Sequence, residues 1–242
     1  MDYEEAIVIE EVLLAIDLPV LSHQGLEYGT VTNEAALRKH LDDAADAYRL
    51  SSLLQLYQTF PNLIARRLPD QVDANGFVPY SSWISPLALR ITRILRRIPP
   101  SSSMRCLQPL LCLCAGTGLR YDNTTPTTPF AQPQGQAFGM PPMMGVNVED
   151  PAGHNSIPSA FGYSMPLPGG VIGESELETA SARRFLMERL SRLEQSLPPK
   201  PIQVEKQLLK QIWATYDYET HTESETHWLD IMVNSGLESI FG

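Results

Sequence analysis

The chain has 242 residues, of which 43% are hydrophobic and 19% are charged, so it can bury a sizeable core and is neither a disordered tail nor a fibrous repeat. No apolar run approaches the roughly 20 residues that a membrane-spanning helix needs, and the acidic N-terminus lacks the basic region of a secretory signal. The net charge is −10, which excludes a chain that binds nucleic acid over its whole surface, because the phosphates would repel it.

The charge is unevenly distributed along the chain. Residues 1–60 carry 3 basic and 11 acidic side chains, whereas residues 61–121 carry 8 basic and 2 acidic ones. Any contact with DNA must therefore be made by this middle stretch or elsewhere. The cysteines, an odd and clustered set of three, argue against a disulfide framework and indicate a reducing compartment.

The first part of the chain has a helical period. Residues 3–16 predict a first helix that ends near Asp17 and Pro19. Asn33 is the expected N-cap of a long second helix, which continues to Pro61 and is followed by a further turn. Apolar residues recur in this second helix at helical spacing: Leu37, Leu41, Ala44 and Tyr48.

A third helix is expected to begin with Ser85 as N-cap and Pro86 at the first helical position. Its apolar face comprises Ile84, Leu87, Ala88, Ile91, Ile94, Leu95 and Ile98, and its opposite face carries Arg90, Arg93, Arg96 and Arg97. Residues 104–118 then predict an apolar helix that is kinked at Pro109 and closed by Gly116 or Gly118. Three cysteines fall in this apolar stretch and are interpreted as small buried hydrophobes: Cys106, Cys112 and Cys114.

Residues 122–173 contain 9 prolines, 8 glycines and no Lys or Arg. Such a composition cannot bury enough apolar surface to offset the entropy of ordering, so this stretch is predicted to be a disordered insert. A spacer between two helical parts is the favoured interpretation. Docking of a partner through the scattered Phe and Met side chains is the alternative.

Helical spacing resumes after the insert. One helix carries the seam Leu186, Leu190, Leu193 and Leu197, and the next, opened by Pro201, carries Leu208, Leu209, Ile212, Trp213 and Tyr216. A last short helix is expected to bury Trp228, Leu229 and Met232 and to end at Gly236. The sequence thus predicts an irregular all-α fold of about seven helices, in which residues 1–121 and 174–242 are two halves that pack on each other.

Three motifs resemble sites of chemistry. Asp42, Asp43 and Asp46 have the D-D-x-x-D spacing that binds magnesium and diphosphate in terpene synthases, but the facing carboxylates that such a site requires are missing, and a solvated acidic face is favoured. The G-T-G after the cysteines matches the glycine loop of nucleotide-binding folds only weakly. The end of a helix is the favoured interpretation of these glycines. The run His221, Glu223, Glu225 and His227 cannot share one helix face and indicates an acidic loop. We therefore expect no enzyme, no metal site and no cofactor.

The arginine face (Arg90, Arg93, Arg96 and Arg97) has two interpretations. It can contact phosphates or a partner, or it can pair with the acidic surface of residues 1–60. Pairing within the chain or with a partner protein is favoured over DNA.

Two motifs stand near the end of the chain: W-x-x-x-D, formed by Trp213 and Asp217, and a closing segment with Asp230, Met232, Gly236, Leu237 and Gly242. Together with stretches that cover most of residues 50–121 and 182–242, they resemble the C-terminal regulatory domain of fungal Zn(II)2Cys6 transcription factors, which typically closes with these two motifs.

The resemblance implies a nuclear regulator of transcription in a fungus, often tied to secondary-metabolite gene clusters. Its partners are expected to be the transcription machinery or another regulator, with a homodimer left open. In the family, six cysteines hold two zinc ions and read DNA, whereas the three cysteines here cannot hold such a cluster. We therefore expect regulation through protein contacts, and no sequence-specific DNA binding by this chain.

Overall fold

The computed structural model describes residues 2–16, 33–72, 76, 78–121, 173–218 and 226–237. All regular structure in these ranges is helical, with eight α-helices and two short 3₁₀ helices, so the all-α prediction is confirmed for this part of the chain. The prediction of a disordered insert falls, except for Gly173, outside the described residues. Helices from before and after the insert pack together in one compact unit.

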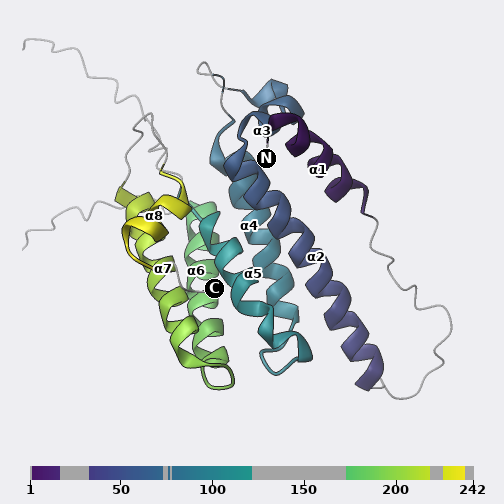
Figure 1. The fold of residues 1–242 in the computed structure, drawn as a ribbon, viewed down its shortest axis with the longest axis vertical. Helices are drawn as coiled ribbons and strands as arrows, with labels where there is room; N and C mark the ends of the chain where they lie inside the picture. Colours follow the sequence, from purple (N-terminus) through teal and green to yellow (C-terminus); the bar gives the residue numbers. More distant parts are fainter. Residues whose placement is uncertain are drawn as a thin grey trace, which may run out of the picture. The chain divides into compact units, whose positions relative to one another are not determined.

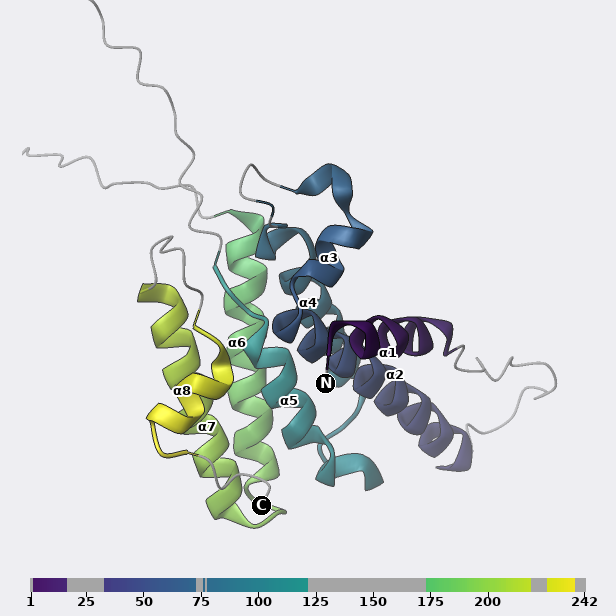
Figure 2. The ribbon, with the colours of Figure 1, turned by 45° about the horizontal axis from the view of Figure 1, so that its top comes forward.

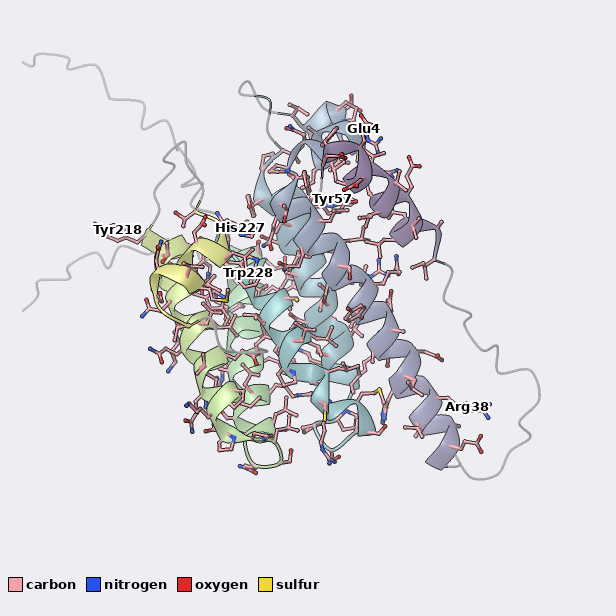
Figure 3. All side chains as sticks on the ribbon, viewed as in Figure 1. Glu4, Arg38, Tyr57, Tyr218, His227 and Trp228 are labelled. Carbon is pink, nitrogen blue, oxygen red and sulfur yellow. The ribbon has the colours of Figure 1, made fainter. Side chains whose placement is uncertain are left out.

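Helix α1 (Tyr3–Ala15) begins with a capping box, in which the Asp2 side chain accepts a hydrogen bond from the backbone N–H of Glu5 and the Glu5 side chain accepts one from Asp2. A buried carboxylate attaches this helix to the bundle. Glu10 accepts hydrogen bonds from the Tyr57 hydroxyl at 2.9 Å, from Arg66 at 2.7 Å and from Arg67 at 3.0 Å. Burial alone would raise the pKa of Glu10, but these three hydrogen bonds together lower it. Figure 3 shows Tyr57 between the ribbons of α1 and α2.

Three helices form the middle of the bundle: α2 (Asn33–Thr59), α4 (Tyr80–Arg97) and α5 (Gln108–Thr117). They run side by side in Figure 1, with α4 packed against both α2 and α5. Short elements connect them: α3 (Asn62–Arg67) and the 3₁₀ helices η1 (Pro69–Gln71) and η2 (Ser103–Cys106). The apolar face predicted for α4 is buried, apart from the half-buried Leu87. Helices are thereby confirmed at the expected places in the first half, although α4 and α5 begin at other residues than predicted.

The predicted start of α4 is wrong. The helix begins at Tyr80, and Pro86 lies inside it rather than at its first position. The helix begins earlier in the chain because two residues before Pro86 are packed as part of it. Ile84 is buried, and the ring of Trp83 packs edge-on against Tyr57 with 6.0 Å between centroids. Pro86 is exposed, so water can take the place of the hydrogen bond that its missing N–H would make.

The apolar stretch around α5 also differs from the prediction. Helix α5 begins at Gln108, so Pro109 lies in its first turn, where a missing N–H costs nothing, and makes no kink. Cys106 belongs to η2 and is exposed rather than buried, whereas Cys112 is buried and Cys114 is half-buried. Gly118 is the C-cap, as one of the two predicted alternatives.

The second half contributes α6 (Glu174–Leu193), α7 (Pro199–Tyr218) and α8 (Trp228–Asn234). In Figures 1 and 2 these helices lie on the opposite side of α5 from α1. The stripe predicted for α7 is buried throughout, and so are Leu186, Leu190 and Leu193 of α6, whereas Leu197, expected on the same seam, lies beyond the end of α6 and is half-buried. Helix α7 begins two residues before Pro201. Gly236 ends α8 with a φ of 63°, a conformation that favours glycine.

Four apolar residues that the sequence placed on core-facing stripes are on the surface. In α2, Leu37, Leu41 and Tyr48 are 41%, 45% and 54% exposed, because the buried face of this helix is centred on Ala44, Ala47 and Leu54. In α8, Leu229 is exposed, and Ile231 takes the buried position. Figure 3 shows Tyr218, at the end of α7, directed away from the bundle.

Candidate interaction surface

The four arginines of α4 all have contacts within the chain. Arg97 contacts the carboxylate of Asp43 on α2 at 2.5 Å, and Arg90 lies 3.6 Å from that of Asp46, which also pairs with Arg49 at 2.7 Å. Two of the four thus pair with the acidic residues of 1–60.

The other two arginines contact α6. Arg93 pairs with Glu178 at 2.9 Å, and Arg96 donates to the Ser181 hydroxyl at 3.1 Å while its guanidinium lies 4.9 Å from the ring centroid of Phe185. This face of α4 therefore connects the two halves of the chain. All four side chains keep part of their surface exposed, and their contact with a phosphate or a partner stays a prediction.

The acidic cluster of α2 is divided by these contacts. Asp42 is exposed, whereas Asp43 and Asp46 turn to arginines. Among the described residues, no group of three or more His, Cys, Asp or Glu side chains is placed to hold a metal ion. Of the H-x-E-x-E-x-H run, only His227 is described. Its ring Nδ1 accepts from the backbone N–H of Leu229, so it is the N-cap of α8.

The two glycines of G-T-G allow helices to approach closely. A Cβ on Gly116 would lie 2.3 Å from Leu209 Cδ2, and a Cβ on Gly118 would lie 2.8 Å from the Cβ of Ala88. The carbonyl of Gly116 also accepts a 2.9 Å hydrogen bond from the indole of Trp213. This motif is therefore a packing site at the end of α5, which explains its glycines without a nucleotide.

The W-x-x-x-D motif of α7 is part of a structural junction that also contains Arg183. This buried arginine makes a bidentate pair with Asp217 at 2.7 and 2.8 Å and donates to the Leu119 carbonyl at 2.8 Å. Its guanidinium lies 4.3 Å from the ring centroid of Tyr121 and 5.2 Å from that of Trp213. Sequence reasoning missed Arg183, although the spacing of Trp213 and Asp217 pointed to this junction.

Two further buried charges were missed. Arg189 on α6 donates to the Ile98 carbonyl and to Gln108, and burial lowers the pKa of its guanidinium. Glu205 on α7 is fully buried, and neither of its carboxyl oxygens has a hydrogen-bond partner among the described residues. Burial raises its pKa well above the ordinary range of a carboxyl group.

An apolar groove, here called the α2 groove, lies between α1, α2 and α5 and has a volume of about 400 Å³. It is lined by Ile9, Leu13, Tyr48, Ser51, Ser52, Gln55, Leu56, Thr59, Leu110, Leu111 and Cys114. No lining residue is charged. Tyr48 belongs to the apolar stripe of α2, for which burial was expected, but its side chain is exposed and lines this groove.

Comparison with known proteins finds a similarity in the C-terminal part of the chain. Residues 155–242 match the family model of the fungal specific transcription factor domain, just over a third of the chain. Neither a curated protein nor a solved structure matches significantly. No helix in the described ranges is long and apolar enough to cross a membrane. The match supports a fungal regulator of transcription and gives no support to a terpene-synthase-like enzyme. The resemblance expected from the sequence is thus confirmed over residues 155–242, which match the fungal specific transcription factor domain.

Proposed function

We propose that this chain regulates transcription in a fungal nucleus through contacts with other proteins, and that it does not read DNA sequence by itself. The observation that carries the proposal is the engagement of the α4 arginines. Arg97 and Arg93, which would be the natural phosphate contacts, are already paired with Asp43 and Glu178. Binding to phosphate would compete with these ion pairs.

The surface chemistry supports the same conclusion. Sequence-specific reading needs an element that enters a groove of DNA and places side chains on base edges. The apolar face of α4 is packed in the bundle, and the arginines on its outer face are held in contacts with α2 and α6, which restricts their freedom to reach into a groove. Half-exposed arginines on an acidic chain would give only salt-sensitive attachment, in the non-specific range of roughly 10⁻⁴ to 10⁻⁶ M.

Two finer parts of the proposal rest on the resemblance alone. The targets are proposed to include genes of a secondary-metabolite cluster, and the chain is proposed to need no cofactor and to catalyse no reaction. Deleting the gene should change transcript levels of one such cluster. Unchanged levels of every secondary-metabolite cluster would refute this choice of targets.

A mobility-shift assay tests the mode of action. The whole chain is titrated against promoter DNA at near-physiological salt, beside the variants Arg93→Glu and Arg184→Glu. Both variants change the charge equally, but Arg184 lies on α6, is 83% exposed and, within the described part of the chain, pairs with Glu188 one turn away. We expect weak binding that fades with salt and responds alike to both changes. Nanomolar, sequence-specific binding that Arg93→Glu alone abolishes would overturn the proposal.

A further inference from the structure

The α2 groove combines a mainly apolar lining with a buried polar group that has no hydrogen-bond partner among the described residues. Its floor is formed by the inner side of α2, where Leu56 and Ser51 are buried, and its walls are formed by Leu13 on α1 and Leu111 on α5. A concave, largely apolar site of a few hundred Å³ with a small number of polar groups is typical of sites for small molecules.

This buried polar group is the hydroxyl of Ser51. This serine is only 4% exposed, and its Oγ has no hydrogen-bond partner among the described residues. The neighbouring Ser52 behaves as helical serines commonly do, since its hydroxyl donates to the Tyr48 carbonyl at 3.1 Å. A buried hydroxyl without a partner costs about 1–3 kcal/mol. A ligand with an oxygen or nitrogen at this point would recover that cost.

We propose that the α2 groove binds a neutral, mainly apolar small molecule that forms a hydrogen bond with the Ser51 hydroxyl. No lining side chain is charged, so a carboxylate, a phosphate or an ammonium group buried in the groove would lose its hydration without gaining a counter-charge, and the lining favours a neutral ligand. This binding goes beyond the proposed function and does not depend on it.

Gln55 links the groove to residues 155–242, the segment that matches the family model. This lining residue accepts a 2.8 Å hydrogen bond from the indole of Trp228 on α8, and its amide donates to the Thr117 hydroxyl at 3.2 Å. Figure 3 shows Trp228 on α8, at the side that faces the middle helices. A ligand that contacts Gln55 therefore changes the surroundings of Trp228. Binding in the groove is in this way transmitted to α8.

A fluorescence displacement assay tests the site with defined probes. The full chain is saturated with the neutral dye N-phenyl-1-naphthylamine and is then titrated with diphenylmethanol, diphenylmethane or diphenylacetate. These competitors share one framework and differ in carrying a hydroxyl, no polar group or a charge. The indole N–H signal of Trp228 is followed by NMR in parallel.

Three variants test the groove. Leu110→Trp fills it from α5, and Leu177→Trp places the same side chain on an exposed position of α6 as the control. Ser51→Ala removes only the hydroxyl. Thermal unfolding and circular dichroism establish that each variant is folded.

We expect the dye to be displaced by the alcohol and the hydrocarbon but not by the carboxylate, and the Trp228 signal to shift. Ser51→Ala should weaken the alcohol about 2- to 10-fold, as expected for one hydrogen bond, and leave the hydrocarbon unchanged. Leu110→Trp should abolish dye binding, and Leu177→Trp should not.

Three results would overturn the proposal. One is displacement by the carboxylate as strong as by the alcohol. Another is equal dye binding by the two tryptophan variants. The third is sedimentation that reveals a dimer which Leu110→Trp dissociates, because a second copy of the chain would then fill the groove.

Discussion

Replacing Glu205 by methionine is expected to stabilise the fold. The carboxyl group is fully buried on α7, and neither oxygen has a hydrogen-bond partner among the described residues. An unpaired buried polar group costs about 1–3 kcal/mol, and methionine fills nearly the same space with an apolar chain. The free energy of unfolding of Glu205→Met should therefore exceed that of the wild-type chain by this amount or more near neutral pH.

The raised pKa of Glu205 also makes the stability of the wild-type chain depend on pH. Because burial raises the pKa of Glu205 in the folded chain above the ordinary 4.5, the folded chain keeps a proton that the unfolded chain releases. The wild-type chain therefore loses stability as the pH rises from 4.5 towards the folded-state pKa, by up to about 1.4 kcal/mol per pH unit.

Urea unfolding at pH 5 and pH 7 measures both effects. The advantage of Glu205→Met should be larger at pH 7 than at pH 5. A variant that is less stable than the wild type at both pH values, or an advantage that does not change with pH, would refute the reasoning.

Three further predictions concern packing, a helix cap and thiols. Gly118→Ala should lower the free energy of unfolding by about 1–3 kcal/mol, because its Cβ would lie 2.8 Å from the Cβ of Ala88. Chemical unfolding checks this value, and a change below about 0.5 kcal/mol would contradict the close packing. Acid should loosen α8. Burial lowers the pKa of His227 below 6.5, so the unfolded chain binds more protons below that pH, and the stability that the neutral cap gives is lost as the pH falls. Trp228 fluorescence in His227→Asn, where the cap cannot titrate, should lose this acid transition, and its persistence would assign the transition to another group. Finally, iodoacetamide should modify the exposed Cys106 first, because burial raises the pKa of Cys114 to about 12 and that of Cys112 well above its usual value. Mass spectrometry of the folded chain follows the order of labelling, and equal labelling of all three thiols would contradict it.

The helices were predictable because apolar spacing reports local structure. The stripe of α7 and the apolar face of α4 both became core, since each has a single apolar face that can be buried in only one way. The start of α4 was not predictable from Pro86, because the packing of Trp83 and Ile84 outweighed the preference of proline for a first turn. Local signals were overridden where tertiary contacts competed with them.

The candidate sites depended on tertiary contacts that spacing does not contain. Glu10, Arg183 and Glu205 appear in the sequence as ordinary charges on amphipathic helices, and their burial follows only from the neighbouring helices. The groove arises for the same reason. The stripe of α2 was recognised, but the buried face of this helix is centred on Ala44, Ala47 and Leu54, so Tyr48 is exposed and lines the groove instead of lying inside the core.

A tethering assay tests the central claim, regulation through protein contacts, most directly. The whole chain is fused to the DNA-binding domain of an unrelated regulator and brought to a reporter promoter in a fungal host, so that its own contact with DNA is no longer needed. The account predicts that reporter transcription changes relative to the DNA-binding domain alone, and that Arg93→Glu does not abolish the change in a folded fusion. A stably expressed nuclear fusion that leaves reporter transcription unaltered would contradict the claim.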